Sequence, residues 1–304
     1  MHDDCNLQMI RKTPRAEPAA PILVVPAAGL GTRMRHVLPG VPKELLPIGG
    51  KPAIQHALAM GRDAGCLRAV VVLHPDKQTI ARWLRDPKPD SLYTQAAAQE
   101  MQELNQAMDI AMIRQPEPQG EADAIALCRN LVQDGVMAVA YPDNIHLPES
   151  PGGPGALRAL RQALAGLGAD PAGSGVDMIG LMDPGSANAG VSDSGRVDLA
   201  PVPGSLPRIR DFLPKGEGPF VKRFPDELRT CGIYLALPHF FDFIEQARAA
   251  MGRPGPGNEL TDGKVRRLML RAGVTFYGAP LPGQVFDVGN PQGYALCRAY
   301  VDSL

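Results

Sequence analysis

Short apolar runs of strand length alternate along this chain with longer segments in which apolar residues recur at helical spacing. The runs are predicted to be buried strands at residues 22–25, 69–73, 110–113, 137–141, 177–182, 233–237 and 274–277. The longer segments are predicted helices at residues 53–64, 77–84, 97–108, 122–131, 156–167, 239–250 and 291–301. Short strands separated by helix-length segments are typical of parallel strands joined by crossover helices, so the pattern predicts an α/β fold.

The pattern changes between residues 185 and 225, where short pieces are broken by Gly, Pro and Asp. This composition predicts hairpins and loops inserted over one edge of the main sheet. Residues 1–20 contain Pro14 and Pro18 and no hydrophobic core of a signal peptide, and we expect a flexible leader there. We therefore expect a single domain over residues 21–304, with a small β insertion at about residues 185–230.

Composition narrows the class of protein further. The 304 residues are 44% hydrophobic and 21% charged, and the net charge is −1, so no nucleic-acid or membrane surface is expected as a partner. No apolar run approaches the roughly 20 residues of a membrane-spanning helix. The five cysteines are scattered without a Cys-x-x-Cys pair, which argues against a metal cluster or a disulfide framework and favours a cytoplasmic location.

A glycine turn follows the first predicted strand, in the segment 26–33 (Pro-Ala-Ala-Gly-Leu-Gly-Thr-Arg). Gly29 and Gly31 let the backbone turn tightly and approach a phosphate chain, because no Cβ stands in the way. The N–H groups of such a turn can point inward as an anion-binding nest. Arg33 and Lys43 place two cations just downstream. The combination predicts a triphosphate site.

Two other nucleotide-binding signatures fit this segment less well. A dinucleotide-binding fingerprint needs a third small residue, where this chain has Met34, and an acid about 20 residues further on, where none stands near Gly49 and Gly50. A Walker-type loop needs Gly-Lys-Ser/Thr, and here Lys51 is followed by Pro52. An ordinary strand followed by a glycine turn is the plainest alternative.

Two aspartates stand where a cation for the phosphates could bind. Asp143 follows the apolar run that begins at residue 137, and open α/β sheets bind ligands outside the carboxyl ends of their strands. Asp287 also follows an apolar approach, and Asn290 is expected to cap the closing helix in its place. Mg²⁺ takes oxygen ligands and bridges to substrate phosphates, so the two carboxylates could share one ion. For Asp143 the alternative is a turn-forming Pro-Asp-Asn without a metal.

The connection 114–120 leads from a predicted strand into a predicted helix. The amide of Gln115 could pair with the edge of a nucleobase, and Gly120 would allow close backbone approach. A proline-stiffened connection without a ligand is the alternative. No histidine stands at a metal-ligand spacing and no Gly-x-Ser-x-Gly elbow is present, so the sequence gives no sign of a hydrolase triad.

Taken in order, these residues resemble the sugar-1-phosphate nucleotidyltransferases and, within them, the bacterial UTP–glucose-1-phosphate uridylyltransferases. The matching segments are 27–33, 42–47, 51–52, 114–118, 142–144, 190–191, 232–234, 260–262 and 286–290. The resemblance extends from about Ile22 to the C-terminus.

The resemblance implies a Rossmann-like, mostly parallel mixed sheet flanked by helices, with the β insertion on the sugar side. It implies Mg²⁺-dependent transfer of a nucleotidyl group from an NTP, here UTP, to a hexose 1-phosphate, here glucose 1-phosphate. The products are a nucleotide-sugar and pyrophosphate. Relatives commonly form dimers or tetramers, so a homo-oligomer is expected.

The resemblance also assigns roles to residues of this chain. Arg33, Lys43 and Asp143 would be catalytic, and Asp143 with Asp287 would hold Mg²⁺. The nucleotide would be bound by Ala27, Ala28, Gly29, Gly31, Thr32, Gln115 and Gly120. The sugar phosphate would be contacted by Gly190 and Lys215.

The segment 209–216 departs from the family, which usually carries Glu-Lys-Pro beside the sugar phosphate. Lys215 keeps the cation, but Pro214 stands for the glutamate and Gly216 for the proline; Lys222 is an alternative for the phosphate-binding lysine. The departure leaves open another sugar, or another base from dTTP, CTP or GTP. It also leaves open a regulatory paralogue that binds nucleotide-sugar with little turnover, and a dinucleotide oxidoreductase is a more distant alternative.

Overall fold

The computed structural model describes residues 20–117, 119–132, 135–150, 152–167, 175–184, 195–214, 216, 218, 220–252 and 258–304. Three predictions fall outside these residues. They are the flexible leader, apart from residue 20, and the two sugar-phosphate contacts Gly190 and Lys215.

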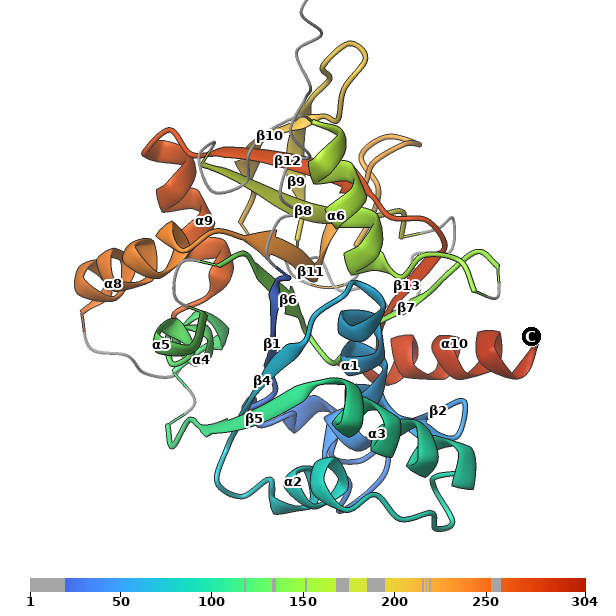
Figure 1. The fold of residues 1–304 in the computed structure, drawn as a ribbon. Helices are drawn as coiled ribbons and strands as arrows, with labels where there is room; N and C mark the ends of the chain where they lie inside the picture. The colour runs from blue at the N-terminus through green and yellow to red at the C-terminus, as the bar shows by residue number, and fades with distance from the viewer. Residues whose placement is uncertain are drawn as a thin grey trace, which may run out of the picture.

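A nine-stranded sheet runs through the centre of the molecule (Figure 1). Its strands, in spatial order, are β5 (Asp109–Arg114), β4 (Arg68–Leu73), β1 (Ile22–Pro26), β6 (Met137–Ala140), β11 (Arg229–Ala236), β8 (Val176–Met182), β12 (Thr275–Pro280), β10 (Arg208–Phe212) and β9 (Val197–Ala200). β5, β4, β1 and β6 run parallel, as do β8 and β12, whereas β11 is antiparallel to both of its neighbours. β10 and β9 add antiparallel strands at one end. Every predicted strand is present, and the predicted α/β fold is confirmed.

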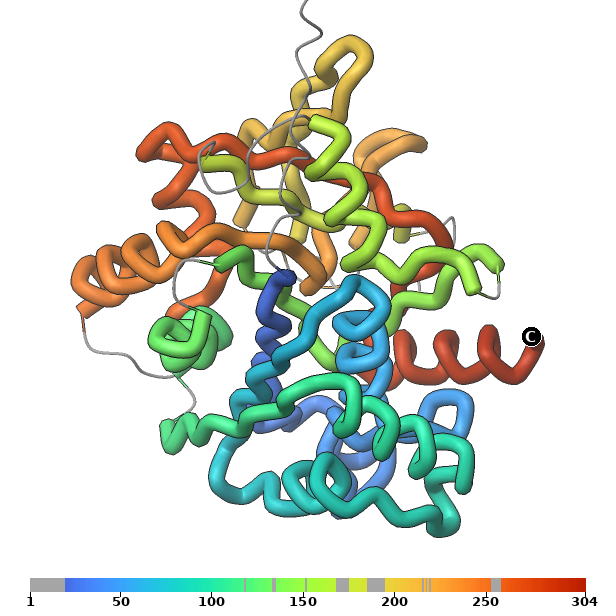
Figure 2. Tube along the Cα trace, in the orientation of Figure 1, coloured from blue at the N-terminus to red at the C-terminus, as the bar shows by residue number. Residues whose placement is uncertain are grey.

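Helices cover both faces of the sheet (Figures 1 and 2). They are α1 (Ala53–Asp63), α2 (Gln78–Arg85), α3 (Gln95–Ala107), α4 (Glu121–Ala126), α5 (Arg129–Val132), α6 (Ala156–Gly166), α8 (His239–Met251), α9 (Asp262–Arg271) and α10 (Pro291–Asp302). Leu23 of β1 packs in a core cluster with residues of α1, α3 and α6, and its neighbour Val24 packs in a second cluster with residues of α4, α8 and α9. Successive strand residues point to opposite faces, so one buried strand feeds both cores.

A third, smaller core ties the C-terminal helix to the N-terminal loops. Two short ladders contribute to it: β2 (Pro47–Ile48) with β3 (Lys51–Pro52), and β7 (Asn144–Leu147) with β13 (Gln284–Asp287). Ile48, Ile145, Val288 and Cys297 are buried together there. Figure 1 shows α10 beside β2 and β13. This packing brings the last 20 or so residues of the chain to the loops that follow β1 and β6.

Two helices differ from the prediction. The helix predicted at 122–131 is divided into α4 and α5, because the chain turns at Leu127 and Cys128, where the Cys128 N–H donates to the Ile125 carbonyl at 2.9 Å. α9 was not predicted: it is rich in Lys and Arg, and its apolar face is narrow. Its start is marked by Thr261, whose side chain accepts a hydrogen bond from the Lys264 N–H. Within the described ranges, no helix combines the length and apolarity needed to cross a membrane.

Candidate active site

The loops after β1 and β6 leave the sheet at the same edge. The two strands pair in parallel, with Ile22 opposite Met137 and Val24 opposite Val139. Their carboxyl ends therefore deliver the glycine turn and the segment 141–143 to neighbouring positions, as the rule for open α/β sheets predicts.

The chain changes direction at Gly31, within the glycine turn. Its φ of 58° and ψ of 31° are left-handed, a conformation that glycine adopts without steric cost. Its carbonyl accepts a hydrogen bond from the Met34 N–H at 2.9 Å, which closes the 3₁₀ turn η1 (Thr32–Met34). A Cβ built on Gly31 would lie 3.2 Å from Cγ of Lys43. The absence of a side chain at Gly31 thus makes room for the catalytic lysine candidate.

The other predicted residues of this turn divide into anchors and exposed positions. Ala27 and Ala28 are buried, and the Ala27 N–H donates to the Val72 carbonyl at 2.9 Å. Gly29, Thr32 and Arg33 are exposed. The turn is therefore held by its start, and its middle and end are open to a ligand.

Lys43 and Asp143 form an ion pair, with 2.5 Å between Nζ and Oδ2. Lys43 begins the 3₁₀ turn η2 (Lys43–Leu45), and each side chain is 19% exposed. Burial acts to raise the pKa of Asp143, but the Lys43 ammonium, helped by Arg33, holds that pKa below its ordinary value. Burial acts to lower the pKa of Lys43, yet the carboxylates of Asp143 and Glu44 raise it. Both groups are therefore charged at neutral pH.

Asp287 reaches the same place from the far end of the sequence. β13 and β7 pair antiparallel with Asp287 opposite Asn144, and the Val288 N–H donates to the Asp143 carbonyl at 2.8 Å. A Cβ built on Gly289 would lie 2.8 Å from Oδ2 of Asp143 and 3.1 Å from Oδ1 of Asp287. The two carboxylates thus converge over Gly289. Burial and the negative charge of Asp143 raise the pKa of Asp287. The carboxylates of Asp143 and Asp287 therefore repel each other, and a bound cation would relieve this repulsion.

This donor set suits a hard divalent cation bound together with a substrate. Within the described residues, no group of three or more His, Cys, Asp and Glu side chains could hold a metal by itself. Mg²⁺ usually takes one or two protein carboxylates and completes its shell with waters and substrate phosphates. Two converging carboxylates beside an open turn match that pattern. Asn290 caps α10 as predicted, accepting from the Gly293 N–H at 2.8 Å, which leaves the Asp287 carboxylate out of the cap.

Lys77 is a buried cation that the motifs did not identify. Its Nζ donates to the Ala27 carbonyl at 2.7 Å, the Gly29 carbonyl at 2.5 Å and Oε1 of Glu44 at 2.8 Å. Glu44 is only 1% exposed, and its second oxygen has no hydrogen-bond partner among the residues that the structure describes. Lys77 therefore joins the glycine turn to the residue next to Lys43. A sequence signal was available, because Lys77 follows β4 at the same edge of the sheet.

Gln115 is held inside the protein. It is 3% exposed, and its Nε2 donates to Oδ2 of Asp123 at 2.7 Å and to the Gly120 carbonyl at 3.3 Å. Gly120 has a φ of 119°, and a Cβ there would overlap the backbone of Leu260. In this structure Gln115 fixes the turn at Gly120, and its contact with a base stays a prediction.

Beside Gly120, two acids from distant segments meet. Burial and the nearby Asp262 raise the pKa of Glu121 to about 7. Asp262 itself accepts a hydrogen bond from the Tyr141 hydroxyl at 3.1 Å and pairs with Arg266 at 2.9 Å. The Ala122 N–H donates to the Leu260 carbonyl at 3.1 Å, which joins the start of α4 to the residues just before α9.

On the side of the β9–β10 edge, one predicted cation can be placed. Lys222 pairs with Asp183 at 2.6 Å. Nearby, Glu227 is 1% exposed and accepts from Arg196 and Arg223, each at 2.6 Å. Lys222 is thus engaged with a carboxylate, and its role toward a sugar phosphate stays a prediction.

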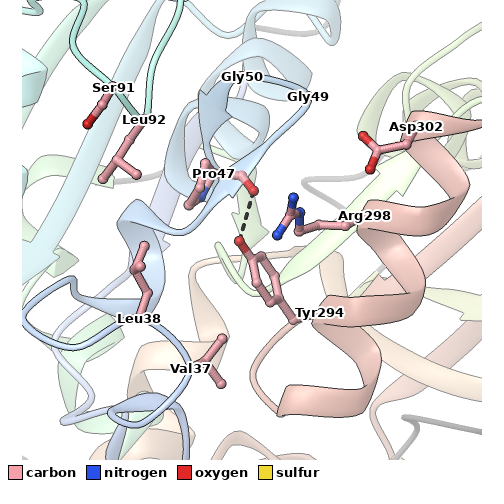
Figure 3. Close-up of a pocket in the computed structure, with 10 residues that line it drawn as sticks. All are labelled: Val37, Leu38, Pro47, Gly49, Gly50, Ser91, Leu92, Tyr294, Arg298 and Asp302. Carbon is pink, nitrogen blue, oxygen red and sulfur yellow. Dashed lines mark hydrogen bonds between the residues drawn. The ribbon is translucent and has the colours of Figure 1, made fainter.

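A separate pocket of about 500 Å³ lies between α10 and the N-terminal loops (Figure 3). It is lined by Val37, Leu38, Pro47, Gly49, Gly50, Ser91, Leu92, Tyr294, Arg298 and Asp302. The Tyr294 hydroxyl donates to the Pro47 carbonyl at 3.1 Å across it, and Arg298 and Asp302 stand on α10 (Figure 3). Of the predicted site residues that the structure describes, none lines this pocket.

Known proteins resemble this chain in sequence. The family profile described as a MobA-like NTP transferase domain matches residues 23–170. The UTP–glucose-1-phosphate uridylyltransferase YngB of Bacillus subtilis (strain 168) is 28% identical over 275 residues, which cover 89% of this chain and 85% of that protein. The UTP–glucose-1-phosphate uridylyltransferase of Staphylococcus haemolyticus (strain JCSC1435) is 27% identical over 278 residues, covering 89% and 88%.

Solved structures share the fold. A UDP-glucose pyrophosphorylase complexed with UDP-glucose superposes with a TM-score of 0.73 at 22% identity, covering 93% of this chain and 99% of the other. A UTP-bound UGPase from Acinetobacter baumannii superposes with a TM-score of 0.68 at 23% identity, covering 92% of each chain. The resemblance to the sugar-1-phosphate nucleotidyltransferases, and within them to the bacterial UTP–glucose-1-phosphate uridylyltransferases, is therefore confirmed over most of the chain.

Proposed function

We propose that this protein transfers a uridylyl group from UTP to glucose 1-phosphate, giving UDP-glucose and pyrophosphate, with Mg²⁺ as cofactor. The observation that carries the proposal is the convergence of Lys43, Asp143 and Asp287 beside the open turn at Gly31. The names of the relatives support uridine and glucose as the base and the sugar.

The reaction needs positioning and charge neutralisation more than covalent chemistry. An oxygen of the sugar phosphate forms a bond to the α-phosphorus of UTP, and the bond from that phosphorus to the bridging oxygen breaks, releasing pyrophosphate. Mg²⁺ held by Asp143 and Asp287 would neutralise charge on the phosphate oxygens.

The chain's own groups supply the remaining stabilisation. The N–H groups of the glycine turn can cradle the triphosphate, and the exposed Arg33 can reach its outer oxygens. Lys43 is held at the reacting end by Asp143, and its raised pKa keeps it charged as negative charge grows on the α-phosphate. Because Lys77 fixes the turn relative to η2, these donors are positioned before the substrate binds.

Pyrophosphate release with UTP, glucose 1-phosphate and Mg²⁺ tests the proposal. We expect turnover by the wild type and a loss of at least 100-fold in Asp143→Asn, which keeps the shape and removes the charge. Asp242→Asn is the matched control: Asp242 lies on α8, is half exposed and pairs with Arg129, so activity should stay within twofold. Full activity in Asp143→Asn would remove the metal assignment.

A panel of five NTPs against several sugar 1-phosphates tests the base and the sugar. We expect UTP and glucose 1-phosphate to give the highest kcat/KM. Turnover with another pair of substrates would change the assigned base or sugar and would still support a nucleotidyl transfer. Binding of nucleotide-sugar without turnover of any pair would contradict the proposed enzyme activity and would indicate a paralogue that only binds nucleotide-sugar.

A further inference from the structure

The side-chain amide of Gln115 is held in one orientation. Its Nε2 donates to Oδ2 of Asp123 at 2.7 Å and to the Gly120 carbonyl at 3.3 Å. A carboxylate and a carbonyl only accept hydrogen bonds, so the nitrogen of the amide, and not its oxygen, must face them. Both N–H bonds of the amide are thereby used inside the protein. Gln115 can therefore offer a ligand only its oxygen, Oε1, as an acceptor.

Asp123 is itself held from the other side. It stands on α4 with 13% of its side chain exposed, and its Oδ1 accepts from Arg248 of α8 at 2.7 Å. Arg248 also pairs with Glu245 at 2.6 Å. Each oxygen of the Asp123 carboxylate thus has its own donor, and these two charge-assisted or buried contacts restrain the carboxylate from rotating away from the amide.

Gln115 lies at the same edge of the sheet as the glycine turn. Its N–H donates to the Leu73 carbonyl, and the Ala27 N–H donates to the Val72 carbonyl, each at 2.9 Å. Consecutive carbonyls at the end of β4 therefore hold both segments. Because β5, β4 and β1 are adjacent parallel strands, Gln115 lies two strand spacings, about 10 Å, from the start of the turn. A nucleotide whose phosphates lie in the turn can place its base at this distance.

The base atom that meets Oε1 distinguishes the two pyrimidines uracil and cytosine. The two rings have the same shape, but N3 of uracil carries a hydrogen and N3 of cytosine carries a lone pair. With N3 toward Oε1, uracil donates a hydrogen bond, whereas cytosine places two acceptors against each other. A site built to hydrogen-bond a group rejects an analogue that lacks it, because the buried polar atoms are left unpaired. Gln115 could serve cytosine only if its amide turned over, and Asp123 opposes that turn.

We propose that Asp123 makes this site select uracil over cytosine, by holding the Gln115 amide with its oxygen toward N3 of the base. Asp123 is then a positioning residue, which acts through Gln115 and does not touch the substrate. The inference rests on the proposed function and assigns a residue to the choice of its base.

The ratio of kcat/KM for UTP to kcat/KM for CTP, each with glucose 1-phosphate, tests the inference. Asp123→Asn supplies an amide that can donate to Oε1, so the Gln115 amide can turn over, and we expect the ratio to fall by about tenfold or more. Asp123→Ala also releases the amide and should lower the ratio in the same direction. Glu103→Gln is the matched control: Glu103 also accepts from a glutamine amide, that of Gln99 at 3.2 Å, but it is exposed on α3, and the ratio should be unchanged.

A double variant shows whether Asp123 acts through Gln115. Gln115→Leu removes the amide and should lower the ratio as Asp123→Asn does. In Gln115→Leu/Asp123→Asn we expect no further fall, because no amide is left to orient. A further fall in the double variant, or an unchanged ratio in folded Asp123→Asn or Asp123→Ala, would overturn the inference.

Calorimetric binding of UTP and of CTP, without a sugar phosphate, gives a measurement that needs no turnover. The wild type should bind UTP about tenfold or more tightly than CTP, and Asp123→Asn should narrow the difference. Equal affinities in the wild type would overturn the inference, whatever the variants do. Selective binding of UTP that depends on Asp123, with no turnover of any substrate pair, would instead contradict the proposed function and support the role of Asp123.

Discussion

At the scale of single residues, the contact between Gly31 and Lys43 explains why a glycine is needed in the glycine turn. Gly31 has a left-handed backbone and lies against the Lys43 side chain, so two independent constraints act on one position. Gly40 has a similar φ of 79°, but a Cβ there would meet nothing within 4 Å. Comparing substitutions at Gly31 and Gly40 therefore separates the free-energy cost of the left-handed backbone from the cost of displacing Lys43.

Gly31→Ala should lower activity much more than stability. A left-handed alanine costs about 1 kcal/mol, and its Cβ would also push Lys43 away from the position it shares with Asp143. We expect a drop in kcat of at least tenfold and a loss of roughly 1 kcal/mol in the free energy of unfolding. Pyrophosphate release and urea denaturation measure the two quantities. Gly40→Ala should show the same loss of stability with unchanged kcat, and equal kcat in both variants would contradict the role of Gly31.

The sequence allowed us to predict those site residues that stand in a recognisable local motif. Lys43, Asp143 and Asp287 each stand in a distinctive segment, and the structure brings all three together. Lys77 was missed because no local motif identifies its partners, although its place after β4 puts it at the same edge of the sheet. Lys77 meets Glu44 across 33 positions, because β1 and β4 pair in parallel and the segments that follow them leave the sheet at the same edge. Such roles depend on strand pairing, which a local pattern does not specify.

At the scale of elements, Lys77 connects the start of α2, the glycine turn and η2. Lys77→Met would leave the buried Glu44 carboxylate without its cation. Removing one partner of a buried ion pair costs about 3–5 kcal/mol, so we expect a loss of that order in the free energy of unfolding, measured by urea denaturation. Activity should fall as well, because the turn is no longer held relative to Lys43.

The double variant Lys77→Met/Glu44→Gln distinguishes the two effects. Removing the stranded carboxylate should recover much of the stability, since the remaining amide carries no buried charge. Activity should stay low, because the donors to the Ala27 and Gly29 carbonyls are still missing. Recovery of full activity in the double variant would show that Lys77 acts only by neutralising Glu44.

The elements that sequence predicted best are those with long, simple apolar patterns. β1 and β4 are continuous buried runs, and α1 has a broad apolar face. The short β13 and the basic α9 were not predicted, because few of their residues are buried and tertiary contacts select their conformation. β13 matters most for the site: its pairing with β7 carries Asp287 to Asp143. The sequence predicted that Asp143 and Asp287 share one ion because both are carboxylates that follow apolar runs. The pairing of β13 with β7, which brings them together, is seen only in the sheet topology.

At the scale of the whole molecule, the Glu121–Asp262 pair makes stability depend on pH. It joins α4, in the first half of the chain, to α9, near its end. Burial and the charge of Asp262 raise the pKa of Glu121 to about 7, whereas an unfolded glutamate titrates near 4.5. Between these two values the folded state binds more protons than the unfolded state, so Glu121 contributes less to stability as pH rises, and its contribution is constant above about pH 7.

Glu121→Gln should therefore stabilise the protein at pH 8 and have little effect at pH 5, where the folded wild type already carries a protonated, uncharged side chain at this position. A shift of one pKa unit corresponds to about 1.4 kcal/mol, so the rise from 4.5 to about 7 predicts a gain of about 3 kcal/mol at pH 8, measured by urea denaturation at both pH values. Glu117→Gln is the control, because Glu117 is exposed and lies in the same connection. An equal effect of Glu121→Gln at both pH values would mean that the loss of a packing contact, and not relief of the charge, determines the change. A destabilisation confined to pH 8 would mean that the ionised carboxylate is compensated within the fold, which would reverse the assigned direction of its pKa.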